Sequence, residues 1–539
     1  MSTTDAPIES DLERTDTDDS DPNWWGRAIA GAVGAAGALT FAELIDGISD
    51  QVPSLVVAVG EVIVDYAPGD VAAQSIETLG TAQKTITLWG IVIAALVIGA
   101  LLGWRSRKSL RPVIIGFGLF AVVGGWAAAR NPLSSTGWAW VTAFLAAAVG
   151  IGITAFLLRV LRGPARGSDP SEAGEDPTNP HHNRRNFLAW AGAGAVGSVV
   201  LARWARHLET SSGVQSAREA LTLPGDAANT DEALRALTTL DDVPGIAPYI
   251  TPNDDFYLID TAFTKPQVNP DTWSLDINGM VDNPYSLSFA ELQAMEAIDV
   301  PITLSCVSNE VGGDLVGNAV WTGVPLLDVL EEAGIQDGAE QVFGRSVDDF
   351  TAGFPLELLR DGRQALVAYG MNGEPLPIQH GFPVRLVVAG VYGYVSAVKW
   401  VEEISLTTWD GVDGFWIPRG WGKLGPIKTQ SRIDAPRNND TVAAGRVAVG
   451  GVAWAPTRGI SGVEVRVNAG DWQPADLGEG LSDETWLQWK FEFDAEPGQI
   501  ALQCRAIDGD GTVQPDSIAP PRPDGAEGHH TILLNVDSA

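Results

Sequence analysis

Cysteine is almost absent from this chain, because Cys306 and Cys504 are the only two among 539 residues. Two single cysteines so far apart supply neither a disulfide framework nor a paired-cysteine metal motif, so each thiol requires its own explanation. Basic residues are scarce as well: 34 Lys and Arg stand against 68 Asp and Glu, which gives a formal net charge of -34. Phosphate backbones repel such a chain, and no nucleic-acid partner is expected.

Charged residues of both signs are few for a chain of this length. They make up 19% of the sequence, whereas soluble proteins average about 25%. Long uncharged stretches therefore coexist with very acidic ones, which is typical of a membrane region joined to an exposed domain. Lysine occurs only seven times, and acids outnumber bases two to one, which indicates a surface adapted to high salt in a halophilic, archaeal-like source. The length itself predicts three or four domains.

The first part of the chain predicts a disordered tail followed by a membrane region. Residues 1–23 hold eight acids, one arginine and few apolar side chains, so they cannot bury enough surface to become ordered. Residues 24–206 contain five apolar stretches near the ~20 residues that a helix needs to cross hydrocarbon. These are 24–44, 86–104, 112–129, 137–158 and 187–205. The stretch 53–66 is shorter and carries two acids, so it is not expected to cross.

Basic residues predict the orientation of these spans. The loops at 105–111 and 159–185 hold most of the arginines of the region, and loops of this kind stay on the cytoplasmic side. Five spans with a cytoplasmic N-terminus then place everything after residue 205 outside. The pair Arg184-Arg185 directly precedes the fifth stretch and resembles a twin-arginine export signal. An ordinary topological anchor explains the pair equally well.

Three further units are predicted beyond the membrane region. Residues 207–250 are irregular and predict a linker with one helix. Residues 251–435 alternate strand-like and helical runs with Pro and Gly at the turns, which predicts an α+β domain. Residues 436–539 contain short β-rich runs separated by Gly, Pro and Asp, which predicts a β-sandwich domain.

Cys306 lies where a predicted strand passes into a polar loop. The segment 302–309 is Ile-Thr-Leu-Ser-Cys-Val-Ser-Asn, and Gly312, Gly313 and Gly317 follow it. A thiol in this position can face a ligand that the loop holds, and a thiolate is a soft donor that suits a heavy metal. A single cysteine is more often a small buried apolar residue, so the position alone does not decide between the two.

A second group of residues suits an anionic ligand. The segment 380–385 is His-Gly-Phe-Pro-Val-Arg, and a glycine-bearing stretch leads on to Lys399. Arginine offers a planar fork for phosphate, lysine a mobile ammonium group, and glycines let backbone amides approach closely. Two cations in one short stretch are unusual in so acidic a chain. Salt bridges on a solvated surface remain the alternative for both.

Four blocks in this order resemble the sulfite oxidase family of molybdenum-cofactor enzymes. They are the Cys306 loop, residues 317–326, residues 380–385 and residues 396–400. The resemblance covers residues 253–406, and more loosely the β-rich tail, which is similar to the immunoglobulin-like domain of the family. It implies an oxidoreductase whose molybdenum is held by one cysteine and by the dithiolene of a single pyranopterin.

The resemblance also implies which residues bind the metal and the cofactor. The metal ligand and catalytic residue is Cys306. The other cofactor contacts are an early segment, a hydroxyl residue, two residues that hold the pterin phosphate, and a last loop. In that order, they are matched by Asp254, Tyr257 and Leu258; Ser346; His380 and Arg385; and Ser396, Val398 and Lys399.

The sequence departs from the animal-type members of the family in the early segment. Those enzymes carry an Arg and a His that help to hold an anionic substrate, whereas Ile259 and Thr261 stand there in this chain. Nearby acids at 254, 255 and 260 add negative charge. We therefore expect poor turnover of sulfite and better activity with a neutral oxo substrate such as an S-oxide.

The bacterial methionine-sulfoxide-reducing relatives have a similar early Phe-Tyr segment, and they also follow twin-arginine signals. Two asparagines of those relatives are replaced here by Asp254 and His380, so their substrate does not carry over directly.

The six histidines bear on the redox partners. They are His181, His182, His207, His380, His529 and His530, and none lies in a predicted span. Membrane haem needs axial ligands that these spans do not offer, and no Cys-x-x-Cys-His motif for a covalent haem occurs. No haem is therefore expected, and electrons pass to or from a separate partner. His529 and His530 are expected on the solvated surface, and Cys504 in the buried part of a strand.

These observations predict a membrane-anchored, outward-facing oxidoreductase that binds molybdenum and molybdopterin and acts on a small-molecule oxo substrate. Sulfite dehydrogenase is the first alternative. A cofactor-free extracellular binding or adhesion module that kept the fold is the second. The oligomeric state stays open, with a homodimer among the options.

Overall fold

The computed structural model describes most of the chain beyond residue 23. The described residues are 24–49, 54–67, 82–132, 134–162, 185–198, 200, 213–223, 234, 237, 239–240 and 243–538. The chain divides into two compact units, the first comprising Met1–Val59, Thr87–Ala129 and Ser135–Arg206, the second Gly60–Ile86, Arg130–Ser134 and His207–Ala539. The predicted tail, Arg184 and much of the predicted linker lie outside the described residues.

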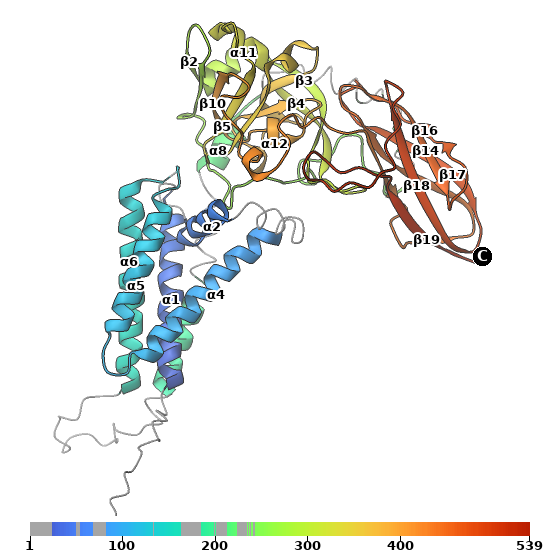
Figure 1. Cartoon of the computed structure of the whole chain (residues 1–539). Coiled ribbons are helices and arrows are strands. Elements are labelled where there is room, and N and C mark those ends of the chain that lie inside the picture. The colour runs from blue at the N-terminus through green and yellow to red at the C-terminus, as the bar shows by residue number, and fades with distance from the viewer. Residues whose placement is uncertain are drawn as a thin grey trace, which may run out of the picture. The chain divides into compact units, whose positions relative to one another are not determined.

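The first unit consists mainly of long apolar helices (Figure 1). Four helices are long and apolar enough to cross a membrane, namely α1 (Trp24–Asp46), α4 (Ala82–Arg105), α5 (Arg111–Ala128) and α6 (Thr136–Arg162). They coincide with the first four predicted stretches, which are thereby confirmed as helices. The fifth stretch is helical at residues 185–198, and most of its remainder lies outside the described residues. The helix α2 (Leu55–Tyr66) has 12 residues and is not a candidate span, as predicted.

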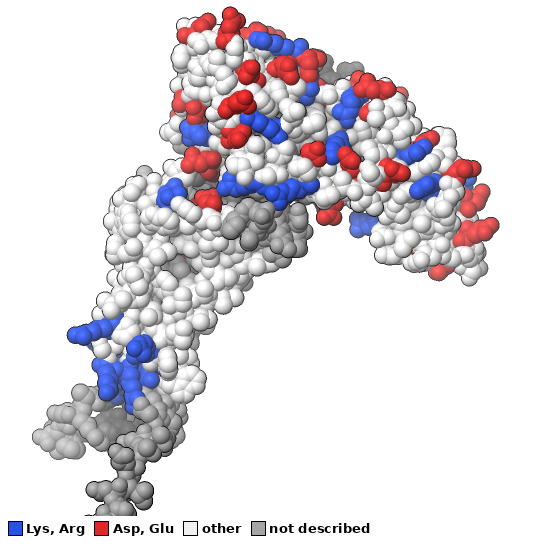
Figure 2. All heavy atoms as spheres, in the orientation of Figure 1, with Lys and Arg blue, Asp and Glu red and all other residues white. Residues whose placement is uncertain are grey.

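Small residues let these helices pack closely. A Cβ atom on Gly31 of α1 would lie 2.0 Å from the carbonyl oxygen of Gly99 in α4, and one on Gly34 would lie 2.0 Å from Thr154 Oγ1 of α6. Such contacts are the usual means of packing helices in lipid, where burial of apolar surface does not drive association. Figure 2 shows their visible faces nearly free of charge, with Lys and Arg gathered at one end. This surface suits a hydrocarbon environment.

The α+β part of the second unit contains one mixed and one antiparallel sheet. The mixed sheet has the order β2-β1-β10-β5-β6, in which β1 and β10 are parallel. Its strands are β1 (Ser274–Gly279), β2 (Tyr285–Ser288), β5 (Gln341–Ser346), β6 (Thr351–Pro355) and β10 (Val401–Thr407). The antiparallel sheet has the order β3-β4-β7-β8, and β9 pairs with β7. Its strands are β3 (Ile298–Ser305), β4 (Val316–Pro325), β7 (Ala365–Met371), β8 (Glu374–Pro375) and β9 (Arg385–Val388).

Short helices connect these strands and contribute to the core. They are α10 (Phe289–Ala294), α11 (Leu326–Ala333), α12 (Gly393–Ser396) and the 3-10 turns η1 (Leu356–Arg360), η2 (Ile378–His380) and η3 (Ile417–Arg419). The capping box of Ser288 and Glu291 starts α10, because each side chain accepts a hydrogen bond from the other residue's backbone N–H. The helix α8 (Gly213–Ala220) precedes this part and is the helix predicted within the linker.

The β-rich part of the second unit forms two more sheets. One has the order β11-β13-β17-β16 and the other β12-β19-β18-β14-β15. The strands are β11 (Gln430–Ala435), β12 (Thr441–Ala443), β13 (Gly445–Trp454), β14 (Ile460–Val467), β15 (Gln473–Pro474), β16 (Asp476–Leu477), β17 (Leu487–Ala495), β18 (Gly498–Asp508) and β19 (Thr531–Asp537). Both sheets supply side chains to one core, for example Val449 from the first and Leu502 from the second. Strand β11 pairs with β13 of this part, although the predicted domain boundary at 435/436 assigns the residues of β11 to the preceding α+β domain.

Predictions for Cys504 and His530 concern the burial of their side chains in this part. Cys504 is fully buried on β18, as predicted, and burial raises the pKa of its thiol to about 12. The expectation that His530 lies on the solvated surface is wrong. Its ring is largely buried, and Nδ1 accepts a hydrogen bond from the backbone N–H of Ile433 at 3.0 Å. Burial, followed by the charge of Arg432, lowers the pKa of His530 to about 4, so the ring is neutral.

Candidate metal and cofactor site

Cys306 immediately follows β3 and is 8% exposed. Its backbone N–H donates to the carbonyl oxygen of Leu315 at 2.9 Å, and this bond closes the turn that leads into β4. The thiol accepts a hydrogen bond from the backbone N–H of Ser308 at 3.4 Å. Burial raises the pKa of the Cys306 thiol, while the Ser308 contact and the charge of Lys399 act in the opposite direction. A soft metal bound here would have to displace the thiol proton.

Arg385 is a buried cation at the start of β9. It is 4% exposed, and among the described residues no carboxylate lies within 4.0 Å of its guanidinium group. It donates instead to the carbonyl oxygens of His380 at 3.1 Å and of Leu386 at 3.4 Å, and it lies over the ring of Trp321. Burial lowers its pKa to about 10. A buried charge without a counter-charge is costly, so the position suits an anionic ligand.

His380 offers an unused hydrogen-bonding atom beside Arg385. It is fully buried, and its Nε2 lies 3.0 Å from the carbonyl oxygen of Asn253, so Nε2 carries the proton. Its Nδ1 is buried without a hydrogen-bond partner among the described residues. Burial and then the charges of Lys399 and Arg385 lower the pKa of His380 to about 3. The free lone pair therefore suits a ligand with a hydroxyl or ring N–H donor.

Lys399 belongs to a cluster of three lysines around one carboxylate. Its Nζ donates to Asp260 at 2.9 Å and to the carbonyl oxygen of Gln379 at 3.0 Å. Lys265 and Lys84, which both belong to the second unit, donate to the same carboxylate at 2.5 and 2.9 Å. Three ammonium groups share one carboxylate, which gives these four side chains a formal charge of +2, and the nearby Asp348 also acts on Lys84 and Asp260. The cluster therefore has positive charge left for an anion.

The pKa values of this cluster follow from burial and from the ion pairs. Burial alone raises the pKa of Asp260, but the charges of Lys399, Lys84 and Lys265 outweigh it and hold the pKa well below its usual range. Burial lowers the pKa of Lys399 to about 8, although the carboxylate of Asp260 partly opposes the change. Asp260 therefore keeps Lys399 largely protonated at neutral pH.

Three other buried residues that the resemblance names, Ser396, Val398 and Ser346, lie in segments that lead to this cluster. Ser396 ends α12, and its hydroxyl donates to the carbonyl oxygen of Tyr392 at 3.1 Å. The carbonyl oxygen of Val398 accepts from the N–H of Leu386, next to Arg385, at 2.9 Å. Ser346 ends β5, where the following residue is bonded to Trp400 beside Lys399. Segments 346, 385 and 396–399 are therefore brought together.

The early segment contributes aromatic side chains. Tyr257 stacks on Phe256 at 5.1 Å, and Phe256 meets the rings of His380 and Trp321 edge to face. Burial and then the nearby Cys306 sulfur raise the pKa of the Tyr257 hydroxyl, while Arg385 opposes the rise. These couplings indicate that Tyr257 lies near both Cys306 and Arg385.

The other two predicted residues of the early segment lie differently. The side chain of Asp254 is exposed and has no hydrogen bond to the cluster among the described residues, and Leu258 is 38% exposed. The predicted cofactor roles of both stay predictions.

Sequence reasoning missed Asp260, Lys265 and Lys84 as site residues. Asp260 was counted only as negative charge near the substrate, whereas its carboxylate is neutralised by three lysines. The short spacing of Asp260 and Lys265 was one available signal for a local ion pair. The two other partners lie 139 and 176 residues away along the chain, so no local pattern indicates them.

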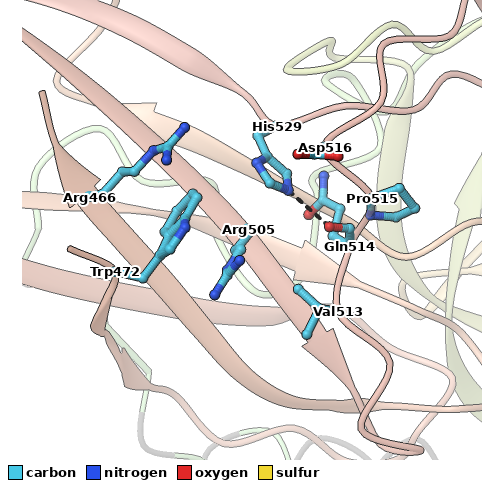
Figure 3. A pocket seen from close by; sticks show the side chains of 8 residues that line it. All are labelled: Arg466, Trp472, Arg505, Val513, Gln514, Pro515, Asp516 and His529. Atoms are coloured by element: carbon cyan, nitrogen blue, oxygen red, sulfur yellow. Dashed lines mark hydrogen bonds between the residues drawn. The ribbon is translucent and has the colours of Figure 1, made fainter. Parts of the chain in front are cut away.

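A separate cavity of about 280 Å³ lies in the β-rich part (Figure 3). Trp472 lies between the guanidinium groups of Arg466 and Arg505, whose carbons are 4.5 and 4.3 Å from its ring centre. Arg505 pairs with Glu464, and Asp516 also lines the cavity, so the local charges balance. None of its eight lining residues is a cysteine or a predicted cofactor contact.

The chain has several known relatives. A family model described as an oxidoreductase molybdopterin binding domain matches residues 262–416. The mitochondrial sulfite oxidase of Rattus norvegicus is 32% identical over 325 residues, which cover 50% of this chain and 58% of the rat protein. The uncharacterized oxidoreductase YuiH of Bacillus subtilis is 35% identical over 153 residues, which cover 28% of this chain and 74% of that protein. The sulfane dehydrogenase SoxCD of Paracoccus pantotrophus aligns at a TM-score of 0.48 and 21% identity, over 59% of this chain and 94% of that chain.

This chain spans 58% of the length of the mammalian mitochondrial sulfite oxidases that it matches. The matched family region includes Cys306 and the unpaired Arg385. The lysine-bound Asp260 lies two residues before this region. The sequence resemblance and the region matched by the family model thus point to the same site and to the same class of cofactor, molybdenum held by molybdopterin. The chain belongs to the sulfite oxidase family and is a molybdopterin-dependent oxidoreductase.

Proposed function

We propose that this oxidoreductase transfers an oxygen atom at a molybdenum centre whose protein ligand is the Cys306 thiolate. One observation carries the proposal: among the described residues, the buried Arg385 guanidinium has no carboxylate partner, and His380, whose carbonyl oxygen Arg385 binds, has a buried Nδ1 without a hydrogen-bond partner. A bound pterin with its phosphate supplies both missing partners. The donor set therefore fits the cofactor of the family.

The chain's own residues have distinct roles in this proposal. When bound, the molybdenum–pterin group supplies two-electron exchange of an oxygen atom with the substrate. Cys306 holds the metal, and Arg385 and Lys399 neutralise the phosphate. Asp260 orients Lys399 and keeps it protonated. Buried aromatic rings, including Phe256, exclude water from this side of the site, which strengthens these electrostatic contacts.

We propose a small neutral oxo substrate, such as an S-oxide. Ile259 and Thr261 add no positive charge beside Tyr257, and Lys84 and Lys265 are already bonded to Asp260. An anion such as sulfite needs cationic donors that are free to bind it, at about 1.5 to 3 kcal/mol for each charge-assisted hydrogen bond.

Sulfite dehydrogenase remains the second candidate. The net positive charge of the lysine cluster favours it, since Lys84 and Lys265 are each about one-third exposed and could turn toward an anion. Sulfite oxidases are also among the relatives of the chain.

Steady-state assays with sulfite oxidation and S-oxide reduction on the same metal-loaded preparation separate the two candidates. The proposal predicts S-oxide turnover and weak sulfite turnover. Efficient sulfite oxidation with a Michaelis constant at the low-micromolar end of ordinary enzyme values would favour the alternative. A preparation without molybdenum or pterin would favour the cofactor-free binding module.

We also propose that the helices anchor the protein in the cell membrane with the catalytic region outside and that a separate redox partner exchanges electrons with it. The apolar helix faces and the cations at one end support the anchoring. For the β-rich part, with its two sheets around one core, we propose the immunoglobulin-like arrangement of the family. Protease accessibility of residues 251–539 in intact cells tests the orientation.

A further inference from the structure

The loop that follows Cys306 is closed by its own hydrogen bonds. We call residues 306–315, between β3 and β4, the Cys306 loop. Besides the bond from the N–H of Cys306 to Leu315, the side-chain oxygen of Asn309 accepts from the N–H of Leu315 at 2.9 Å. The N–H of Asn309 in turn donates to the carbonyl oxygen of Cys306 at 3.0 Å. A shift of the distal part of the loop is therefore transmitted to Cys306.

A residue of the β-rich part binds the distal end of this loop. Arg432 on β11 donates from Nη1 to the carbonyl oxygen of Gly313 at 2.8 Å. Its Nε is fixed by Asp434 at 2.5 Å, and the other carboxylate oxygen of Asp434 accepts from the N–H of Ala247 at 3.0 Å. The side chains of Arg432 and Asp434 are only 11% and 9% exposed. Arg432 is thus a rigidly held donor that faces the loop.

His530 supports the same end of the loop through its ring. A Cβ atom on Gly312 would lie 2.2 Å from Cδ2 of His530, and Gly312 has a φ of +76°, so the loop rests directly on the imidazole. The ring is held in place because Nδ1 accepts from the backbone N–H of Ile433, and the carbonyl oxygen of His530 accepts from the backbone N–H of Cys504 at 3.1 Å. Only glycine satisfies both the backbone conformation and the close approach at position 312.

Arg432 and His530 can change the hydrogen bond between the Ser308 N–H and the Cys306 sulfur. The 3.4 Å approach of the Ser308 N–H to Sγ depends on the backbone path of the loop. Hydrogen bonds to a ligating sulfur tune the potential and stability of its metal, so the partners of a ligand matter as well as the ligand. Among the described residues, no hydrogen bond joins Arg432 or His530 to the Cys306 sulfur, so in this proposal both act on the sulfur through the loop.

We propose that Arg432 and His530 are positioning residues for the Cys306 sulfur, which makes the β-rich part a working component of the metal site. This inference rests on the proposed function for its redox readout. Arg432 and His530, more than 100 positions after Cys306, set the conformation of the Cys306 loop. Through the loop they set the exposure of the thiol and the environment of the metal.

The variants are chosen to separate positioning from folding. Arg432→Met removes the donor but keeps much of the side-chain volume, and Arg432→Lys keeps a cationic donor as the conservative rescue. His530→Asn retains an acceptor for the N–H of Ile433 but removes the ring beneath Gly312. Arg446→Met is the matched control, because Arg446 belongs to the same β-rich part and makes only an exposed ion pair with Glu492.

The first measurement needs no metal. The full chain from cells grown without molybdate is alkylated with iodoacetamide, and mass spectrometry gives separate rates for Cys306 and Cys504. The proposal predicts that Cys306 reacts about fivefold or more faster in Arg432→Met and His530→Asn, the effect of losing about one net hydrogen bond on loop opening. Cys504 is fully buried, and its N–H is bonded to the carbonyl oxygen of His530, so its rate reports opening of the β-rich part itself. Equal Cys306 rates in these variants and the Arg446→Met control would overturn the proposal, as would equal acceleration of both cysteines, which indicates general unfolding.

The second measurement uses the metal-loaded chain. The proposal predicts a shifted midpoint potential and altered paramagnetic resonance g-values for molybdenum in Arg432→Met and His530→Asn, with partial recovery in Arg432→Lys. Unchanged values in both variants at full metal content contradict it. If the wild-type chain binds no molybdenum, the proposed function fails, and the alkylation rates decide the positioning role by themselves.

Discussion

Replacement of Arg385 by methionine should leave the fold intact but prevent retention of the cofactor. In the cofactor-free chain the guanidinium is buried, without a carboxylate partner among the described residues. Methionine fills a similar volume and has no charge to desolvate. The variant should therefore fold with almost unchanged stability and fail to retain the cofactor.

The magnitude follows from the contacts of Arg385. Its pKa falls from 12.5 to about 10 on burial, which corresponds to about 3 kcal/mol against the charged form. Methionine relieves this cost but loses two hydrogen bonds from a charged donor to carbonyl oxygens, at about 1.5 kcal/mol each, the weak end of their range, and a cation–π contact with Trp321 of about 1 kcal/mol. The two sides cancel to within about 1 kcal/mol. In the loaded chain, two lost charge-assisted bonds to the phosphate cost about 3 to 6 kcal/mol, or roughly 100-fold or more in retention.

The assay compares thermal unfolding of the metal-free chain with pterin content after gel filtration. Arg458→Met is the contrasting variant, because Arg458 pairs with the buried Asp508 and its loss leaves that carboxylate without its cationic partner. It should destabilise the chain by about 3 kcal/mol or more. Destabilisation of the metal-free chain by Arg385→Met as large as that by Arg458→Met, or full cofactor retention in Arg385→Met, would contradict this role of Arg385.

Three further predictions concern the ligand, the histidines and the topology. Cys306→Ser should lose molybdenum and activity with little change in unfolding temperature, because a hydroxyl is a poor ligand for a soft metal; metal analysis checks this. The pKa of His530 in the folded chain, about 4, lies below its unfolded value of 6.5, so its contribution to stability is complete above pH 6.5 and is lost as the pH falls toward 4. Unfolding temperatures at pH 7.5 and 5 should therefore differ more in the wild type than in His530→Asn, and an equal difference would refute this role. The loops at 105–111 and 159–185 should be protected from impermeant thiol reagents in intact cells after cysteine substitution, and labelling from outside would reverse the proposed orientation.

The elements with strong periodicity were predictable from the sequence. The four helices that could span a membrane follow from uncharged stretches of sufficient length, and the strand before Cys306 follows from its β-rich run. The buried Cys504 follows from alternation along β18. In each case the signal is local, because hydropathy and spacing along a few turns or a few residue pairs determine the element.

The site was predictable only where single residues carry the chemistry. Residue type and family resemblance predicted roles for Cys306, Arg385 and Lys399, and these roles stay predictions, which the burial of Arg385 and the ion pair of Lys399 support. The three lysines around Asp260 and the support of the Cys306 loop by Arg432 and His530 were missed. These contacts join residues up to about 200 positions apart, and pairing of this kind is decided by tertiary packing.

The most direct test of the account is the molybdenum and pterin content of the purified full-length chain, measured beside Cys306→Ser. We expect about one molybdenum and one pterin per wild-type chain and little molybdenum in the variant. A wild-type chain that is folded and free of both after expression with ample molybdate, or a Cys306→Ser chain with the full metal content, would contradict the central claim that Cys306 is the protein ligand of a molybdopterin centre.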